Sequence, residues 1–481
     1  MLCDNPAQGD GIHWGARLLL LLAVITWFSL RIPLVNQFAL RAHNDATRVL
    51  ASDLPLYYAM ADAVIRHGRV AAYDPRAVLS LQALVTSTTD YRYLREPADA
   101  PLRVFDYNDW GYSLVVAGSW MVPVAPRNLW VVLGVQLLVD ALCLTLICVI
   151  GLRMFSPWAG SGAALFYAAH PTLGSLSTFP YYYYWPIPAV IVSLVIWTFL
   201  YRERSEAPAW RSVALVILLG LVIGAGALVR GTTGTLVLGF GVALLVWGRF
   251  RPRTLLLLGC LGVATLLPLV PTAVVKYRLH GEVQFRAKEI FWHTILCGVG
   301  NWDNPWGLQW QDEVAFNRIR DKYGVVYSLD NARAYDAACH EEVRALWREN
   351  PSLFVRNFWR NLAWGMKFRS AIPADQDVPA VHRSLNQLRL LAALGWLVLM
   401  VAAWRRRELR SHVILLSILV LLPVLQIAPI CRPVYAYISA MFPVEALIGG
   451  AGLAVLFEWV VERLTGKTRP QPRAGAVESP A

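Results

Sequence analysis

The sequence predicts an all-α membrane protein with about ten transmembrane helices and two long extracytoplasmic loops that contain amphipathic juxtamembrane helices. Three observations predict this class. Of the 481 residues, 57% are hydrophobic and 16% are charged. The mean hydropathy is +0.45. The apolar residues also gather into stretches of about 15 to 23, close to the roughly 20 residues that a helix needs to cross a bilayer. A soluble enzyme of this length is therefore excluded.

The first predicted span is an uncleaved anchor, because no small-residue cleavage site follows its apolar run. The later spans follow from apolar stretches separated by polar connections. The full set is Ala16–Leu34, Leu129–Ile150, Pro157–Leu173, Trp185–Leu200, Ser212–Val229, Thr232–Val246, Thr254–Val275, Leu388–Trp404, Val413–Ile430 and Tyr435–Phe457.

Arginine clusters occupy every second connection and predict the orientation. They are Arg202, Arg204 and Arg211; Arg249, Arg251 and Arg253; Arg405, Arg406, Arg407 and Arg410; and Arg463, Lys467, Arg469 and Arg473. By the positive-inside rule both termini are cytoplasmic, and the loops 35–128 and 277–387 face outward. The net charge of +12 thus reports orientation, and we expect no nucleic-acid partner. The C-terminal spans are expected over 388–458, with a disordered cytoplasmic tail over 459–481.

Helix signals continue into both outer loops. Asp53 can cap a helix that carries Pro55 in its first turn and ends at Gly68. The second loop predicts helices over Gln311–Lys322 and Asn331–Glu349, and Asn350-Pro351 begins another. The segment Tyr112–Val124 is too short for a confident span and is predicted to be interfacial or re-entrant.

Metal and cofactor signals are absent from the sequence pattern. The seven cysteines show no CxxC spacing, and no HxxH or HExxH motif occurs. We therefore expect no metal and no cofactor.

Two arginines break the charge pattern at the outer side of the membrane. Arg230 and Arg432 follow predicted spans in short outward connections, where arginine is normally avoided. A guanidinium at this depth can bind a phosphate with paired hydrogen bonds. Alternatively, each side chain reaches a lipid headgroup or pairs with a carboxylate.

Acidic residues near the membrane exit are candidates for a general base. Asp53 begins the first outer helix, where it can either only cap the helix or take a proton from an acceptor hydroxyl. Asp109 is the second candidate. Asp140 lies inside a predicted span. There it has either a functional role or a structural one, as a hydrogen bond that packs two helices together.

Aromatic residues supply candidate substrate contacts. The run Phe179–Pro186 contains four tyrosines, and its default interpretation is an aromatic belt at the membrane interface. Alternatively, Tyr182 and Tyr57 contact a sugar or a polyprenyl chain. His170 is a further candidate contact, with an interfacial histidine as the simpler reading.

These stretches resemble the GT-C superfamily, the polytopic glycosyltransferases that use polyprenyl-phosphate sugars. Asp53-Leu54-Pro55-Leu56-Tyr57-Tyr58, with Ala61, Gly68 and Tyr73-Asp74-Pro75, looks like the family's first-loop signature. Asp109-Trp110-Gly111-Tyr112-Ser113-Leu114 is similar to the end of that loop, although the family's prolines are absent. Leu228-Val229-Arg230 looks like its Leu-x-Arg motif, and Arg432-Pro433 through Pro443 resembles its late Arg-to-Pro segment.

The resemblance implies that residues 1–276 form a catalytic membrane module of mannosyltransferase-like type. It implies Asp53 as the base, Arg230 and Arg432 on the donor phosphate, and transfer with inversion to a lipid, glycan or protein acceptor. The expected setting is the outer face of a bacterial cytoplasmic membrane. Because arginine can hold the charge of the departing phosphate, the chemistry does not require a metal. A transporter or flippase of lipid-linked saccharides is the alternative function.

Overall fold

The computed structural model describes residues 6–44, 54–68, 71–72, 103–104, 110–121, 128–202, 209–285, 290–327, 331–367, 379–435 and 437–465. Nearly all of this chain is helical, and its two strands have two residues each. The predicted all-α membrane class is confirmed.

Eight helical segments of the described chain are long and apolar enough to cross a membrane. The chain is therefore a multi-pass membrane protein. The segments are formed by α1 (Pro6–Asn44), α7 (Leu129–Met154), α11 (Ala209–Val229), η2 and α12 (Gly231–Thr235, Leu236–Gly248), α13, η3 and α14 (Pro252–Leu266, Leu267–Leu269, Val270–His280), α19 (Pro379–Arg405), η6 and α20 (Arg407–Leu409, Arg410–Ile427), and η7 and α21 (Ser439–Met441, Phe442–Thr465).

The other two predicted spans correspond to shorter helices. The first is α10 (Pro186–Arg202), whose apolar part is shorter than the eight. The second is divided into α8 (Pro157–Ala169) and α9 (Pro171–Ser177). The division falls at His170-Pro171 because proline has no N–H to donate and disfavours a helical residue before it.

Several helices run past their predicted ends. One is α21, which was predicted to end at Phe457 and continues to Thr465, so residues 459–465 of the predicted disordered tail are helical. The first span was predicted to end at Leu34, but α1 continues to Asn44. No glycine or proline follows Leu34 in this stretch, so nothing in it interrupts the helix. The span predicted to end at Val275 continues through α14 to His280, where Gly281 takes a left-handed conformation with φ of 72°. Only glycine adopts that conformation without strain.

Small residues allow the membrane helices to pack closely. Gly162 of α8 and Gly450 of α21 face one another so closely that a Cβ on Gly450 would lie 2.3 Å from the Gly162 backbone. Helices in a membrane associate through such close backbone contacts, because lipid offers no hydrophobic driving force. Side chains from both helices join one large apolar core.

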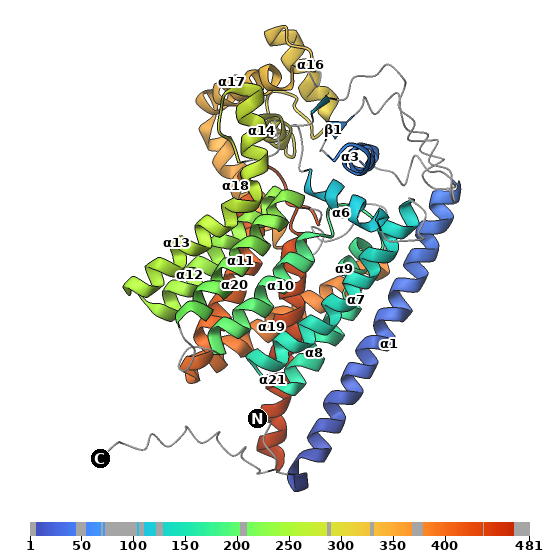
Figure 1. Cartoon of the computed structure of the whole chain (residues 1–481), viewed down its shortest axis with the longest axis vertical. Helices are drawn as coiled ribbons and strands as arrows, with labels where there is room; N and C mark the ends of the chain where they lie inside the picture. Colours follow the sequence, from blue (N-terminus) through green and yellow to red (C-terminus); the bar gives the residue numbers. More distant parts are fainter. Residues whose placement is uncertain are drawn as a thin grey trace.

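Helices outside the membrane gather at one end of the molecule (Figure 1). The first outer loop contributes α3 (Leu54–His67) and α6 (Gly111–Trp120), with β1 (Ala71–Ala72) paired antiparallel to β2 (Arg103–Val104). The start of α1 and the end of α21 lie at the opposite end, as the predicted orientation requires. With ten residues, α6 is only about 15 Å long.

The second outer loop forms an outer module with its own apolar core, here residues 290–327 and 331–367. It contains α15 (Phe291–Val299), α16 (Asp312–Tyr323), α17 (Ala332–Glu349) and α18 (Pro351–Gly365). The helices predicted from Gln311, Asn331 and Asn350 are thereby confirmed. The Asn350 side chain accepts from the Leu353 N–H, as a helix cap does.

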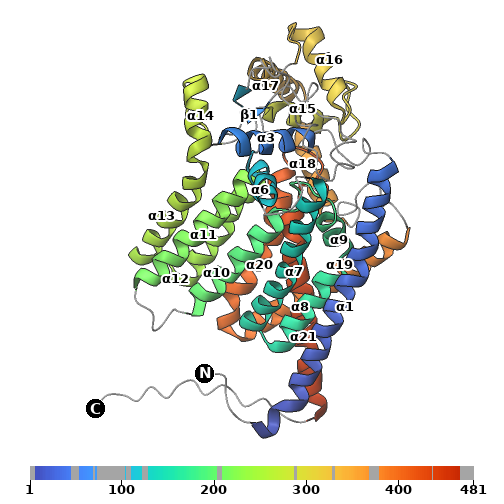
Figure 2. The ribbon, with the colours of Figure 1, turned by 45° about the vertical axis from the view of Figure 1, so that its right-hand side comes forward.

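The outer module is fixed to the segment after α20. A Cβ on Gly298 would lie 1.9 Å from the Ile430 carbonyl oxygen, so only glycine fits there. The Asn361 amide donates to the Ala428 carbonyl at 2.9 Å and accepts from the Trp302 indole at 2.8 Å. These contacts position the module above the outer ends of the membrane helices (Figure 2).

Candidate functional site

Arg230 lies beneath the outer helices, directly after α11. Its N–H donates to the Gly226 carbonyl at 2.9 Å, and its side chain is only 5% exposed. The guanidinium carbon is 5.1 Å from the ring centroid of Tyr182, 4.5 Å from that of Tyr183 and 5.3 Å from that of Tyr437. Aromatic faces attract a cation at these distances. The geometry thus holds a buried positive charge against three rings.

Two outer helices pack against the same rings. The Tyr57 ring of α3 lies 5.2 Å from Tyr182 and 5.5 Å from Tyr112 of α6. The Tyr112 hydroxyl donates to the Pro180 carbonyl at 2.6 Å. We call this group the tyrosine–arginine cluster. Its members are Tyr57, Tyr112, Tyr181, Tyr182, Tyr183, Arg230 and Tyr437.

A buried amide fixes the tyrosine run in place. Gln136 of α7 donates from Nε2 to the carbonyls of Leu176 and Ser177 at the end of α9 and of Phe179 in the turn that follows. Three acceptors around one amide hold the turn that Tyr181 and Tyr182 follow. The rings pack on one another with centroids 4.2 Å apart. Both rings belong to the cluster, and their contact with a sugar or a prenyl chain stays a prediction.

Gly111 explains how α6 reaches the end of α11. A Cβ at this position would lie 2.5 Å from the Leu228 carbonyl carbon and 2.6 Å from the Val229 nitrogen. Any other residue would push the two backbones apart. The neighbouring Trp110 indole donates to the Thr272 hydroxyl of α14 at 2.9 Å. The predicted motif around Gly111 therefore lies beside Arg230.

Tyr437 belongs to the segment between α20 and η7. Burial is the main cause that raises the pKa of its phenol, and Arg230 lowers it. Arg432 lies five residues earlier, with its guanidinium carbon 4.6 Å from the Trp364 ring centroid of α18. The predicted pair of arginines is thus divided between the cluster and the base of the outer module.

The two predicted catalytic acids, Asp53 and Asp109, lie outside the described residues. Asp53 directly precedes Leu54, the first residue of α3, and Asp109 directly precedes Trp110. Sequence reasoning missed Asp62, an acid of α3 whose side chain is 2% exposed. Helical spacing places Asp62 on an otherwise apolar face of α3. An acid at such a position is a sequence signal that could have identified it.

His170 lies in a different group of charges. Its Nε2 is 3.7 Å from the Glu445 carboxylate, which is also 3.3 Å from Arg389. Its Nδ1 accepts from the Leu173 N–H and caps α9. His170 therefore has partners that stabilise the fold. Its contact with substrate stays a prediction.

Asp140 is buried in α7 and accepts hydrogen bonds from four side chains. Oδ2 accepts from Trp27 at 2.7 Å and from Arg31 at 3.2 Å. Oδ1 accepts from Tyr167 at 2.6 Å and from Tyr184 at 3.3 Å. This arrangement joins α1 to α7 and α8, and it supports the helix-packing interpretation of Asp140.

One group in the described chain has metal-ligating side chains close together. It consists of His293, Cys297 and Asp312, whose ligating atoms all lie within 4.8 Å of one another. Sequence analysis missed it because Asp312 joins the pair on α15 only through the fold.

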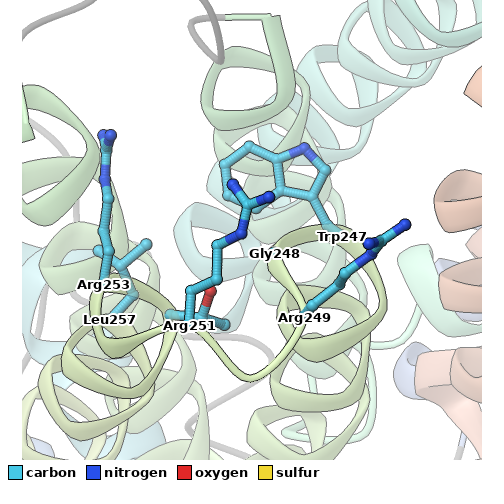
Figure 3. Close-up of a pocket in the computed structure, with 7 residues that line it drawn as sticks. Trp247, Gly248, Arg249, Arg251, Arg253 and Leu257 are labelled. Atoms are coloured by element: carbon cyan, nitrogen blue, oxygen red, sulfur yellow. The ribbon is translucent and has the colours of Figure 1, made fainter.

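A pocket lies at the far end of the molecule, between α12 and α13. It has a volume of about 290 Å³, and its lining includes Trp247, Arg249, Arg251 and Arg253. Figure 3 shows these arginines extending around the turn. All three are exposed and belong to a cluster that the positive-inside rule predicted. The pocket is therefore separate from the tyrosine–arginine cluster.

Comparison with known proteins supports the fold. No protein-family model and no curated protein matches the chain. The crystal structure of the Archaeoglobus fulgidus oligosaccharyltransferase tethered to an acceptor peptide matches with a TM-score of 0.51 and 15% identity, over 96% of this chain and 51% of that one.

Two other solved structures match with lower TM-scores. The archaeal oligosaccharyltransferase AglB from Archaeoglobus fulgidus, in complex with an inhibitory peptide and a dolichol-phosphate, gives a TM-score of 0.49 at 12% identity, over 95% and 52% of the chains. ArnT from Cupriavidus metallidurans gives 0.33 at 13% identity, over 96% and 82%.

The chain spans about half the length of the oligosaccharyltransferase that it matches. Over that half, the two proteins share their fold. The fold expected from the sequence motifs is thereby supported.

Proposed function

We propose that this protein is a membrane glycosyltransferase that moves a sugar from a polyprenyl-phosphate donor to an acceptor hydroxyl on the extracytoplasmic face. The observation that carries the proposal is the buried guanidinium of Arg230, held by tyrosine rings below α3. A lipid phosphate arriving from the membrane would meet a fixed positive charge at this depth. The shared fold with an oligosaccharyltransferase supports the same class of reaction.

The proposed mechanism needs an acid and a cation. Asp53, directly before α3, takes the proton from the acceptor hydroxyl, and the acceptor oxygen displaces the phosphate at the anomeric carbon with inversion. The departing phosphate needs no proton, because Arg230 stabilises its charge. Tyr57 and Tyr182 provide ring faces for the sugar or the prenyl chain.

Arg432, beside Trp364, is proposed as a second, more distant phosphate contact. Asp109 is the second candidate base. No observation favours the alternative of a transporter. Two acids lie within the predicted spans: Asp140 is occupied by four hydrogen-bond donors, and Glu445 is paired with Arg389 at 3.3 Å. A transported proton or ion would need access to such an acid.

The test distinguishes the role of the catalytic base from the role of the residue that contacts the donor phosphate. Membranes that contain the full chain are supplied with polyprenyl-phosphate sugars carrying radiolabelled mannose, glucose, galactose or arabinose, and transfer to endogenous acceptors is measured. We expect Asp53→Asn to lower transfer about 10²-fold to 10⁴-fold while binding of undecaprenyl phosphate, measured by native mass spectrometry, is unchanged. The variant Asp62→Asn tests whether the base is instead Asp62, the described acid of α3.

Arg230→Gln is expected to weaken undecaprenyl-phosphate binding by about tenfold or more. The matched control is Arg153→Gln, because Arg153 also stacks on a ring, that of Phe199 at 3.9 Å, but at the opposite end of the molecule. Wild-type transfer by Asp53→Asn would reject the base. Equal lipid binding by Arg230→Gln and wild type would reject the phosphate contact.

A further inference from the structure

The outer module contains a group of three side chains that the proposed reaction does not use. His293 and Cys297 lie four residues apart on α15, so they share one face of the helix. Asp312 is the first residue of α16, which lies beside α15 in the outer module (Figure 2). Imidazole, thiol and carboxylate therefore come together from two helices.

The separations between the three ligating atoms match a tetrahedral metal site. His293 Nε2 is 3.5 Å from Cys297 Sγ and 3.1 Å from Asp312 Oδ1, and Sγ is 3.9 Å from Oδ1. Around tetrahedral Zn²⁺ with ordinary bond lengths, these three separations would be about 3.5, 3.3 and 3.5 Å. A zinc ion fits after side-chain shifts of a few tenths of an ångström.

The hydrogen bonds distinguish a metal site from a nucleophile with its base. In a Cys-His-Asp relay, the thiol and the carboxylate face opposite nitrogens of the imidazole. Here both face Nε2, whereas Nδ1 is 2.8 Å from the Tyr335 hydroxyl. A histidine that binds a metal typically donates its other N–H to such a partner, which fixes the ring and its tautomer.

The surroundings suit zinc rather than a harder cation. Cys297 is 3% and His293 is 4% exposed, whereas the Asp312 side chain is 72% exposed. The group therefore has a dry side and an open side through which an ion can enter. Cys297 is a thiol in this structure, and thiolate with imidazole selects zinc over magnesium or calcium.

We propose that His293 Nε2, Cys297 Sγ and Asp312 Oδ1 bind one Zn²⁺, with water at the fourth position. The Cys297 thiol releases its proton to solvent when the ion binds. The ion joins α15 to α16, and α15 is itself packed on Ile430 through Gly298. The site is independent of the proposed transfer reaction.

The test measures metal binding by the purified full chain after removal of metals with a chelator. We expect one equivalent of Zn²⁺ to bind. Co²⁺ in its place should give the visible bands of a tetrahedral site and the near-ultraviolet band of a cobalt–thiolate bond. Cys297→Ser should remove the thiolate band, and His293→Gln and Asp312→Asn should weaken binding by more than about 100-fold.

Two further variants separate binding from folding. Tyr335→Phe keeps the three ligands and removes the hydroxyl beside Nδ1, so binding should weaken by about 10-fold to 100-fold. Cys339→Ser removes another buried thiol of the outer module and should keep the thiolate band. Gel-filtration profiles establish that each variant is folded. A wild-type chain that binds no stoichiometric zinc, or a cobalt spectrum without the thiolate band, overturns the proposal.

Discussion

Single buried charges in this protein are stabilised by different partners, and the partners indicate different roles. Arg230 is surrounded by tyrosine rings, whose faces attract a cation without neutralising it. Asp140 is instead paired with Arg31 and accepts three further hydrogen bonds. The first arrangement holds a cation against aromatic faces, whereas the second pairs an acid with a base inside the helix bundle.

Asp140 is therefore expected to stabilise the helix bundle. Asp140→Asn would leave Arg31, which is 1% exposed, without its counter-charge. We expect a loss of about 3 kcal/mol or more, because an unpaired buried charge is costly. Thermal unfolding in detergent measures the loss.

The double variant Arg31→Gln with Asp140→Asn removes both charges and should recover part of the stability. A double variant that is as stable as wild type but inactive in sugar transfer would show instead that Asp140 has a functional role.

At the scale of elements, α16 and α17 are joined by one buried carboxylate. Glu342 of α17, whose side chain is 0% exposed, accepts from Arg318 at 2.6 Å, from Lys322 at 2.5 Å and from Tyr323 at 2.9 Å. Burial raises the pKa of Glu342, but the three donors outweigh burial and hold its pKa below the ordinary value.

This lowered pKa predicts a pH dependence for the outer module. Since the folded-state pKa lies below the unfolded one of about 4.3, the stabilisation is complete above that pH and is lost as pH falls through the folded-state pKa. Glu342→Gln should destabilise the module by about 2 kcal/mol at pH 7, and the difference from wild type should shrink in acid.

Hydrogen exchange of α16, corrected for the intrinsic effect of pH, measures this difference. Glu341→Gln is the matched control, because Glu341 is the exposed neighbour of Glu342. A difference between Glu342→Gln and wild type that stays constant down to the lowest accessible pH would contradict the explanation.

At the scale of the whole molecule, the outer helices lie at one end, and the start of α1 and the end of α21 lie at the other (Figure 1). We call the second end the arginine end, because the predicted arginine clusters are expected there. The outer module carries exposed Glu313, and the other end carries exposed Arg406. If the arginine end faces the cytoplasm, Glu313→Cys should react with a membrane-impermeant maleimide in intact spheroplasts. Arg406→Cys should react only after lysis. The reverse labelling pattern would place the tyrosine–arginine cluster on the cytoplasmic side.

The sequence by itself determined the class of the protein and the limits of many helices. Apolar length predicted the spans, and local signals such as Asn350-Pro351 and Gly68 predicted helix ends, because capping acts within a few residues. Apolar length could not predict that α1 continues to Asn44, because the boundary of an apolar stretch need not be the end of its helix. The separation of α8 from α9 falls at Pro171, a local signal that the predicted span Pro157–Leu173 overlooked.

Only the tertiary structure decided which distant side chains meet. Arg230 and Tyr182 were recognised in the sequence, but the contacts with Tyr437 and Tyr112 require α6, α11 and the segment after α20 to converge. Likewise, Asp312 reaches His293 and Cys297 only because α15 and α16 share a core. Hydropathy and capping depend on neighbours along the chain, whereas a binding site depends on distances in space, and packing alone sets those.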